Sequence, residues 1–546
     1  MVSDAPTTIR CCDASGCRSA GGEALRHALE DAAAGGAAAG SPRIKPVGCL
    51  GLCGRGPLVA VDRADGESRL YGGLVPEQAR ALLLECSAGA PAVSPLATHA
   101  IAATLPFFAL QRPVVLENCG RVDPGSIDDA IAHGAYRQLR RVLDTRTPEQ
   151  VREQLKRSGL RGRGGAGYPT GLKWDTVALQ PPGPRTVVCN ADEGDPGAFM
   201  DRSVLESDPH RLIEGMAIAA FAVGAHQGYV YVRAEYPLAI ERLRLALRQA
   251  RSRGFLGPKV AGSAFDLRLE VRVGAGAYVC GEETALLASI QGQRGTPRPR
   301  PPYPAQQGLW GAPTLINNVE TLSAVPAILR EGGDWYAAMG TATSKGTKVF
   351  ALSGAVRHTG LVEVPMGTPL RTVVELMGGG TPDGGPVKAV QTGGPSGGCI
   401  PAPLLDTPVD YESLLALGSM MGSGGMVVMG ESTAMPEVAL HFMRFSRNES
   451  CGKCLPCRAG TVQLEGLLAR FVERRAVAED LARLEELCAM VRCTSLCGLG
   501  QAAPNPVLST LRHFRGEYEA ACREPAICEP RTACRVPAAA APGAVP

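Results

Sequence analysis

The order of apolar and polar residues at the start of the chain predicts a small α/β unit. GEALRHALEDAAA (22–34) repeats its apolar residues with the spacing of one helix face. LVAVDRADGESRLYGGL (58–74) has two apolar runs around a polar turn, which predicts a pair of strands. We therefore expect a domain at residues 1–90, followed by an alanine- and proline-bearing linker at 91–113.

Apolar strands alternate with amphipathic helices between residues 114 and 340. RTVVCNA (185–191) and GYVYVRAEY (228–236) are predicted strands, and PLAIERLRLALRQARSRG (237–254) is a predicted helix. Such alternation is typical of a doubly wound α/β sheet, so we expect this fold class for the middle of the chain.

The pattern changes twice more toward the C-terminus. TKVFALSGAVRHTGLVEV (347–364) is rich in strand and turn signals and predicts a small β-rich domain at 341–432. AEDLARLEELCAMVR (478–492) restores the helical period and predicts a helical bundle at 433–520. The remaining stretch, 521–546, is low in complexity and is expected to be a tail. The expected fold class is thus a multidomain α/β protein.

Composition narrows the functional classes. The chain has 546 residues, too many for one core, and 56 Lys and Arg against 53 Asp and Glu, which argues against a nucleic-acid binder. We expect no membrane span and a cytoplasmic location, because the sequence has neither a long apolar run nor a signal peptide. In that reducing compartment, the 19 cysteines favour metal or redox chemistry over disulfides.

The strongest chemical signal is ESCGKCLPCRAG (449–460), which places Cys451, Cys454 and Cys457 at C-x2-C-x2-C spacing. Three close thiolates with one distant partner favour a [4Fe-4S] cluster, whereas a zinc site more often divides its ligands two and two. We expect Cys497 in TSLCGLG as the fourth ligand, because its glycines let the backbone approach a cluster; Cys493 is the alternative.

A second cysteine set lies at the N-terminus. Cys12 and Cys17 are separated by four residues, and Cys49 and Cys53 by three, with glycines around the second pair. This spacing favours a [2Fe-2S] cluster over zinc. Cys11 competes with Cys12 as a ligand.

Three further cysteines recur every six residues near the C-terminus and fit no cluster spacing, so their role stays open. They are Cys522, Cys528 and Cys534.

Four glycine- and acid-rich stretches in the α/β region predict a cofactor site. RGRGGAGYPTGLKW (161–174) contains the spacing of a dinucleotide fingerprint but follows a predicted helix, so the ordinary Rossmann assignment fails. Its glycines still admit a planar cofactor or phosphates against bare backbone. CNADEGDPG (189–197) ends a strand, where α/β sheets hold ligands, and GAGAYVCGEETAL (274–286) and LINNVETL (315–322) add polar groups.

These motifs closely resemble those of the flavin-bearing, NADH-binding subunit of respiratory complex I and its relatives in NAD-linked hydrogenases and formate dehydrogenases. The resemblance runs from about residue 112 to 515, and residues 8–86 separately resemble a thioredoxin-like [2Fe-2S] ferredoxin. It implies a Rossmann-like FMN- and NAD(H)-binding domain at 114–340. It also implies a β-grasp-like (ubiquitin-like) domain at 341–432 and a helical bundle with the [4Fe-4S] cluster at 433–520.

The resemblance also implies the cofactor ligands. For FMN they are Gly162, Arg163, Gly164, Lys173, Asn190, Asp192, Tyr278, Gly281, Glu282, Glu283, Asn317 and Asn318. For the nicotinamide nucleotide they are Tyr168, Asp195, Glu283, Arg300 and Tyr303. Both tyrosines stand where the family usually has phenylalanine, Asp195 where it has glutamate, and Arg300 where lysine is common.

The implied activity is electron transfer from a partner subunit through [4Fe-4S] and FMN to NAD+, without a catalytic side chain of the protein's own. The fused N-terminal unit, GGPSGGCIP (393–401) and DTPVDYESL (406–414) most resemble the β subunit of molybdenum-dependent, NAD-reducing formate dehydrogenase. The diaphorase subunit of NAD-reducing hydrogenase and the complex I flavin subunit are alternatives.

The resemblance to formate dehydrogenase implies two partners. They are a molybdenum-containing catalytic α subunit with further iron–sulfur clusters and a small ferredoxin-like γ subunit. Whether the N-terminal cluster is a side reservoir or lies on the electron route stays open. A rival interpretation from another class is a zinc-stabilised scaffold without flavin.

Overall fold

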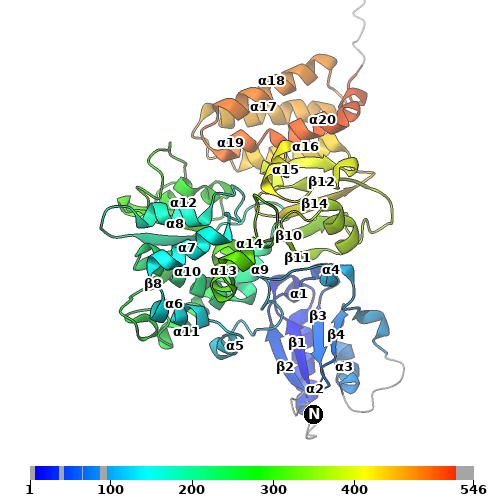
Figure 1. The fold of residues 1–546 in the computed structure, drawn as a ribbon. Helices are drawn as coiled ribbons and strands as arrows, with labels where there is room; N and C mark the ends of the chain where they lie inside the picture. The colour runs from blue at the N-terminus through cyan, green and yellow to red at the C-terminus, as the bar shows by residue number, and fades with distance from the viewer. Residues whose placement is uncertain (1–6, 36–41, 64, 87–94, 524–546) are drawn as a thin grey trace, which may run out of the picture.

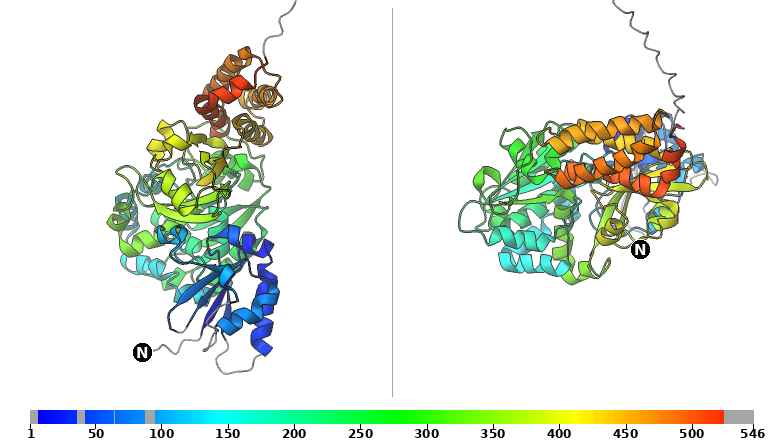
Figure 2. Two further views of the ribbon diagram at one scale, coloured as in Figure 1. Left: turned by 90° about the vertical axis from the view of Figure 1, so that its right-hand side faces the viewer. Right: turned by 90° about the horizontal axis from the view of Figure 1, so that it is seen from above.

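The computed structural model describes residues 7–35, 42–63, 65–86 and 95–523, which form four units (Figure 1). The N-terminal unit and the C-terminal helical unit lie at opposite ends of the molecule (Figure 2). The α/β unit and the β-rich unit lie side by side between them.

The N-terminal unit is a five-stranded sheet in the order β2-β1-β3-β4-β5, in which only β1 and β2 are parallel. The predicted helix at 22–34 and the predicted strand pair at 58–74 are confirmed. The strands are β1 Thr8–Cys12, β2 Arg43–Val47, β3 Leu58–Asp62, β4 Ser68–Gly72 and β5 Ala100–Ile101, and the helices are α1 Ser15–Ser19, α2 Gly22–Gly35 and α3 Ala79–Glu85.

The boundary expected at residue 90 needs a correction. Ala100 and Ile101 pair with Tyr71 and Leu70 of β4, so part of the expected linker 91–113 belongs to the N-terminal sheet. A short helix, α4 Pro106–Ala109, follows it. A two-residue segment that pairs with a strand far back in the sequence carries no periodicity of its own.

The middle unit is built on a four-stranded, all-parallel sheet in the order β8-β7-β6-β9, as the alternation of strands and helices predicts. Its strands are β6 Thr186–Ala191, β7 Gln227–Arg233, β8 Arg268–Gly274 and β9 Thr314–Asn318. Its helices are α5 Ile127–Ala132, α6 Arg137–Thr145, α7 Pro148–Ser158, α8 Thr170–Ala178, α9 Met200–Ser207, α10 Pro209–Val223, α11 Pro237–Ser252, α12 Glu283–Ile290, α13 Val319–Glu331 and α14 Gly333–Ala337.

Strand order in this sheet predicts where a ligand lies. The chain passes from β6 to β7 on one side and later adds β9 on the other side of β6. Loops that leave β6 and β9 therefore diverge at the carboxyl edge of the sheet and open a crevice, the usual ligand position in such folds.

Local sequence explains how the helices begin and end. In α7, Thr147 accepts a hydrogen bond from the Gln150 backbone N–H (3.3 Å), Pro148 takes the first helical position, and Gly159 ends the helix at φ 62°. Helix α10 begins at an Asp208 cap and ends at Gly224 in the same left-handed conformation, and it is buried on nearly all sides.

The β-rich unit has the sheet order β11-β10-β14-β12-β13, with a parallel pair, β10 and β14, between two antiparallel hairpins. This confirms the predicted β-rich domain. The strands are β10 Thr347–Gly354, β11 Gly360–Pro365, β12 Val387–Thr392, β13 Gly398–Pro401 and β14 Gly425–Gly430, with a π-helix at Thr372–Met377 and helix α15 Tyr411–Ala416.

The predicted helical bundle is confirmed. It comprises α16 Met435–Asn448, α17 Leu455–Val472, α18 Ala478–Thr494, α19 Gly498–Ala502 and α20 Asn505–Ala520. Leu464, Leu468, Phe471 and Leu484 form part of its own core. Among the described helices, none combines the length and the apolarity that a bilayer crossing requires.

Glu363 of β11 ties the segment that leads into the α/β unit to the β-rich unit. Its fully buried carboxylate accepts hydrogen bonds from the backbone N–H groups of Val114, Val115 and Leu116 at 2.9–3.0 Å, and from the Thr347 hydroxyl at 2.6 Å. Three backbone donors are thus satisfied by one side chain.

We expect Glu363→Ala to lower the free energy of unfolding by about 3 kcal/mol, because it leaves these buried donors without an acceptor. Urea unfolding followed by circular dichroism measures the change. Glu431→Ala, at an exposed glutamate of the same unit, is the control and should change stability by less than about 0.5 kcal/mol. Equal stability of the two variants would contradict the assignment.

Candidate functional site

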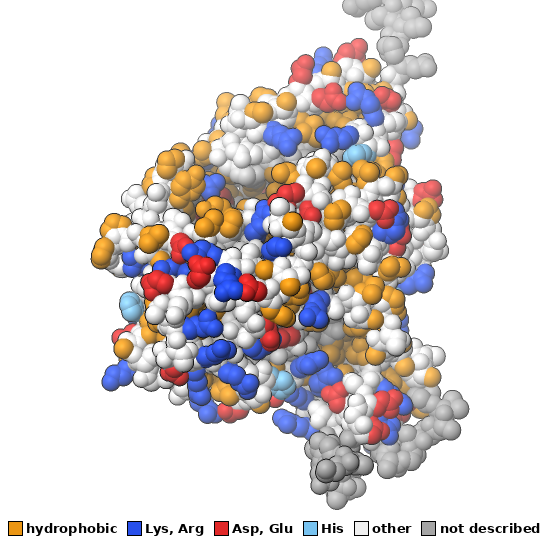
Figure 3. Space-filling model, in the orientation of Figure 1, with side chains coloured by type: hydrophobic (Ala, Val, Ile, Leu, Met, Phe, Trp, Pro, Cys, Tyr) orange, Lys and Arg blue, Asp and Glu red, His pale blue; other side chains and the backbone are white. Residues whose placement is uncertain are grey.

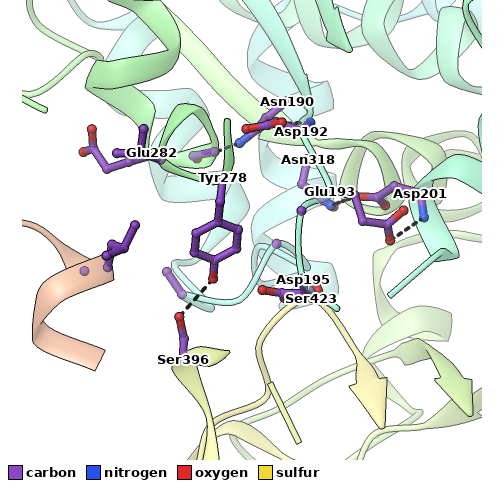
Figure 4. A pocket seen from close by; sticks show the side chains of 17 residues that line it. Asn190, Asp192, Glu193, Asp195, Asp201, Tyr278, Glu282, Asn318, Ser396 and Ser423 are labelled. Atoms are coloured by element: carbon purple, nitrogen blue, oxygen red, sulfur yellow. Dashed lines mark hydrogen bonds between the residues drawn. The ribbon is translucent and has the colours of Figure 1, made fainter. Parts of the chain in front are cut away.

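A cavity of 290 Å3 lies in the crevice at the carboxyl edge of the parallel sheet (Figure 4). Three of the four units line it. The α/β unit contributes the loops after β6 and β9 and the 3-10 turn Tyr278–Gly281, the β-rich unit contributes Ser396 and Ser423, and the helical bundle contributes Gly498 and Leu499.

Seven of the twelve residues expected at FMN line this cavity: Gly164, Asn190, Asp192, Tyr278, Gly281, Glu282 and Asn318. Hydrogen bonds hold the loops that carry them. The Asn190 side-chain amide donates to the Gly281 carbonyl at 2.9 Å, and its oxygen accepts from the Asp192 backbone N–H at 3.1 Å. The end of β6 is thereby joined to the turn before α12.

The consecutive asparagines of β9 have different partners. Asn318 caps α13, and its side-chain amide donates to Asp201 of α9 at 2.6 Å. Asn317 is buried, and its side-chain oxygen accepts from the Trp174 indole N–H at 2.9 Å. Only Asn318 is a cavity residue, because successive side chains of a strand point to opposite faces.

The other four expected FMN residues, besides Asn317, also lie outside the cavity lining: Gly162, Arg163, Lys173 and Glu283.

The Arg163 side chain in particular points into the interface with the β-rich unit. Its buried guanidinium donates to the carbonyls of Thr347 (2.9 Å) and Lys345 (2.6 Å) and to the Tyr336 hydroxyl (3.0 Å). The structure therefore gives this side chain a role in holding the two units together.

The residues expected at the nicotinamide nucleotide divide into an exposed group and one buried residue. Tyr303 is 52% exposed, Arg300 lies 5.8 Å from its ring centre and 4.0 Å from Glu283, and Glu283 also pairs with Lys173. Tyr168 is exposed to the same extent.

Asp195 is the buried one. It lines the cavity and accepts a hydrogen bond of 2.5 Å from the Ser423 hydroxyl of the β-rich unit. The structure thus places this carboxylate among the residues expected at FMN.

Several cavity residues were not among the expected site residues: Ala166, Glu193, Gly194, Asp201, Val279, Ser396, Ser423, Gly498 and Leu499. Glu193 and Gly194 belong to the quoted CNADEGDPG motif, and Ser396 to GGPSGGCIP. Asp201 and Ser423 carry no local signal, because only the packing of α9 and of the β-rich unit brings them to the cavity.

Buried carboxyl groups dominate the electrostatics. Burial raises the pKa of Asp192 to about 7, although the Arg233 guanidinium 3.4 Å away opposes the shift. Burial likewise raises the pKa of Glu193, Asp195 and Asp201. Glu193 is satisfied by the backbone N–H groups of Asp201 and Arg202, both at 3.0 Å, so it also caps α9.

Two acceptor atoms at the cavity have no hydrogen-bond partner within the described part of the chain. They are Asp192 Oδ2 and Asp195 Oδ1, both buried. The lining of the same cavity includes Gly164, where a Cβ would lie 3.1 Å from that of Asn318. Free acceptors beside bare backbone fit a planar ring with N–H donors, as a flavin has.

The four cysteines expected to hold a [4Fe-4S] cluster lie near one another beside the cavity, although no three metal-binding side chains of the described residues are grouped closely enough to hold a metal ion as they stand. Burial raises the pKa of Cys457 to about 11, and the sulfurs of Cys454, Cys497 and Cys451 lie close enough to add to that shift. Cys493 is exposed on the last turn of α18 and is not among them. Leu499, two residues after Cys497, lines the cavity wall.

The N-terminal cysteines also converge, and the structure distinguishes Cys12 from Cys11. The thiols of Cys17 and Cys49 lie close enough to Cys12 to hold the pKa of its thiol well below the usual value, and the sulfurs of Cys49 and Cys53 are 3.7 Å apart. Cys11 points to the other face of β1, into a core with Leu25 and Val59.

Most of the three further cysteines near the C-terminus lie outside the described residues. Cys528 and Cys534 fall there, whereas Cys522 pairs with Ala476 through its backbone at the end of α20.

Helix α9 connects the N-terminal cysteines with the cavity. Asp201 near its start lines the cavity, and the Ser207 hydroxyl at its end accepts a hydrogen bond of 2.8 Å from the Cys49 backbone N–H. Eight helical residues span about 12 Å. The N-terminal sulfurs therefore lie about one short helix away from the cavity.

Comparisons with known proteins agree with this arrangement. The model of the Nuo51 FMN-binding domain matches residues 155–327, and that of the SLBB domain matches 349–400. The model of the NADH-ubiquinone oxidoreductase-F iron-sulfur binding region matches 437–521. These matches support the FMN and [4Fe-4S] predictions, whereas none of them extends to the N-terminal cysteines.

Individual relatives cover much of the chain. It is 55% identical over 410 residues to NADP-reducing hydrogenase subunit HndC of Solidesulfovibrio fructosivorans, covering 75% of this chain and 83% of the relative. It is 46% identical over 412 residues to the F 2 component of NADH-quinone oxidoreductase from Rhizobium meliloti, covering 76% and 98%.

A solved structure extends the likeness further along the chain. The crystal structure of an NAD+-reducing [NiFe]-hydrogenase in the H2-reduced state matches with a TM-score of 0.67 at 33% identity. The match covers 95% of this chain and 85% of that one.

We expect flavin affinity to depend on the charge of Asp192. Because its pKa is raised to about 7, the group is mostly neutral below that pH and a stronger acceptor above it, so FMN affinity should rise with pH around 7 and level off above about pH 8. Fluorescence quenching of FMN by deflavinated protein between pH 5.5 and 8.5 measures this. Asp192→Asn should weaken the dependence, and Asp144→Asn, at an exposed carboxylate, should leave it unchanged. An unchanged pH profile in Asp192→Asn would contradict the role.

We expect Cys12→Ser to remove the iron and the paramagnetic signal of the expected N-terminal [2Fe-2S] cluster, because Cys12 faces Cys17 and Cys49. Cys11→Ser should retain both. Iron analysis and electron paramagnetic resonance of the reduced protein test the pair, with the [4Fe-4S] signal of the same sample as internal standard. Loss in Cys11→Ser but not in Cys12→Ser would refute the assignment.

Proposed function

Because the chain belongs to the family of flavin- and iron–sulfur-bearing oxidoreductase subunits that includes the F component of NADH-quinone oxidoreductase, we propose that it links a nicotinamide nucleotide site to one-electron partners. One observation carries the proposal. The cavity that holds Asn190 and Asp192 shares a wall with the cluster cysteines, because Leu499 lines it two residues after Cys497.

Bound FMN would supply the chemistry, since it exchanges a hydride with nicotinamide and single electrons with iron–sulfur clusters. The protein itself binds the flavin, orients it and shields it from water. Asp192 and Asp195 offer their free oxygens to ring N–H groups, and Gly164 lets the ring lie against backbone. Glu282 caps α12, accepting from the backbone N–H groups of Thr284 (2.9 Å) and Ala285 (3.0 Å), and so fixes the turn that carries Tyr278.

The nucleotide site is proposed at the exposed group beside the cavity. Tyr168 and Tyr303 present rings that can stack on an adenine, and Arg300 supplies a cation beside Tyr303. Glu283 is placed between Lys173 and Arg300, where its carboxylate can accept from ribose hydroxyls. NAD(H) is the proposed nucleotide.

A [2Fe-2S] cluster on Cys12, Cys17, Cys49 and Cys53 is part of the proposal. The first three thiols are at most 5% exposed, and the Cys49–Cys53 loop is covered by β11, whose Leu361 backbone N–H donates to the Gly51 carbonyl at 2.8 Å. A buried cluster offers little surface to an outside partner. This favours a cluster that stores electrons beside the transfer route over a cluster that lies on the route.

Two electron sources are considered. The fused N-terminal unit and the stretches at 393–401 and 406–414 favour formate, with a molybdenum-containing α subunit and a small ferredoxin-like γ subunit as partners. The 55% identity to a hydrogenase subunit and the 33% identity to an [NiFe]-hydrogenase chain favour hydrogen as the second candidate.

Elemental analysis of the complex that copurifies with this chain from its native cell separates these sources. Molybdenum or tungsten without nickel is the expected result, and NAD+ reduction by formate should follow. Nickel would assign the chain to a hydrogenase and leave the cavity and cysteine assignments intact. A folded protein with zinc but neither flavin nor iron would contradict the whole proposal and favour the scaffold.

A further inference from the structure

A strongly basic surface covers the α/β unit away from the cofactor cavity. Residues 137–157 and 237–268 carry fourteen Lys and Arg against five Asp and Glu, whereas the whole chain is nearly balanced at 56 to 53. In the space-filling view, blue side chains gather over α6 and α11 (Figure 3). The positive charge is therefore local and concentrated on two helices.

Six arginines define this arginine face: Arg137, Arg140, Arg141, Arg146, Arg244 and Arg248. The first three lie on the exposed side of α6, Arg146 follows the helix, and the last two are one turn apart on the exposed side of α11.

Packing joins the two helices into one surface. Tyr136, which precedes α6, stacks on Phe255 after α11 at 4.0 Å between ring centres. The Arg140 guanidinium of α6 lies 5.0 Å from the centroid of the same Phe255 ring. Both helices also pack on α10.

The six side chains make no ion pair or side-chain hydrogen bond within the described residues. Their neighbours do: Arg152 pairs with Asp175 at 2.8 Å, and Arg253 and Arg157 pair with Asp128 and Asp334. These three carboxylates are thus already used by other cations. Several unpaired guanidinium groups close together repel one another, and a partner with opposite charge would relieve that repulsion.

The chemistry of the face favours protein over lipid or nucleic acid. Arginine binds carboxylates through two parallel hydrogen bonds, which suits the Asp and Glu side chains of a protein surface. No large exposed hydrophobic side chain among the described residues lies on α6 or α11. The face therefore has no apolar side chain to insert into a membrane and no aromatic ring to stack on bases.

We propose that the arginine face docks a partner protein through a surface rich in Asp and Glu. The helical bundle with the cluster cysteines lies at the far end of the molecule from α6 and α11 (Figure 1). A protein held here leaves the cluster end free for a second partner. The proposal rests on the charge pattern alone and not on which electron source the complex uses.

Zero-length cross-linking of the native complex tests the proposal. Arg141→Lys, Arg244→Lys and Arg248→Lys together keep the charge and supply amines that a carbodiimide joins to carboxylates in contact. We expect cross-links from these positions to Asp and Glu of a copurifying subunit, identified by mass spectrometry. They should fall at least tenfold when salt is raised to about 1 M, where the screening length is about 3 Å.

The matched control carries Arg43→Lys, Arg80→Lys and Arg357→Lys, at exposed arginines without ion pairs on other surfaces. Its three introduced lysines should give no intersubunit cross-links. Cross-links confined to this chain, or equal yields from both triple variants, would overturn the proposal.

Charge reversal gives an independent measurement. Arg141→Glu, Arg244→Glu and Arg248→Glu together should reduce the amount of the cross-linked partner retained on purification at least tenfold. Flavin content and NADH-dependent dye reduction should stay unchanged. The control triple, Arg43→Glu, Arg80→Glu and Arg357→Glu, should retain the partner. Full retention in the first variant would overturn the proposal, as would a loss of binding only to anionic phosphatidylglycerol vesicles or to single-stranded RNA.

Discussion

A buried ion pair between Lys348 of β10 and Glu320 of α13 holds the cofactor cavity together. Both side chains are at most 2% exposed, and the pair joins the β-rich unit to the α/β unit. Lys348 also donates to the Ser423 carbonyl at 2.6 Å, and Glu320 accepts from the Val349 backbone N–H at 2.9 Å. Charges removed from water must be satisfied in this way, so the pair favours the orientation of the two units in which Lys348 meets Glu320. That orientation places Ser423 beside Asp195.

On the opposite side of the cavity, buried carboxylates also need partners within the protein. Glu193 caps α9, and Asp201 of that helix orients Asn318, so buried carboxylates are satisfied by helix N–H groups and amides instead of water. At its other end, α9 contacts the N-terminal unit. Ser207 accepts a hydrogen bond from the Cys49 backbone N–H, and Glu206 accepts one from the Ser15 hydroxyl at 2.5 Å. Cavity and N-terminal cysteines are therefore positioned by one rigid element.

Agreement between sequence and structure is best where the signal is local. The strands β6, β7, β10 and β11, the helices α7, α11 and α18, and the cysteine trio at 451–457 were all predicted from runs of fewer than twenty residues. Agreement is weaker where residues meet from different units. Arg163 and Asn317 belong to cofactor motifs, yet their side chains form hydrogen bonds within the protein. Arg163 donates to the Thr347 carbonyl, and Asn317 accepts from the Trp174 indole N–H. The boundary at residue 90 failed because β5 is only two residues long.

The amino-acid order alone predicted the succession of the units and the two cysteine sets, because periodicity and ligand spacing depend on near neighbours along the chain. The class of cofactor came from the resemblance of its motifs to those of a known family. The folded chain was needed to select Cys12 over Cys11 as the residue that faces Cys17, because the two differ only in the face of β1 from which they project. The fold also brings Asp195 to the cavity, since its partner Ser423 lies more than two hundred residues away. Burial and long-range packing determine the direction of a side chain, and a local sequence pattern predicts neither of them.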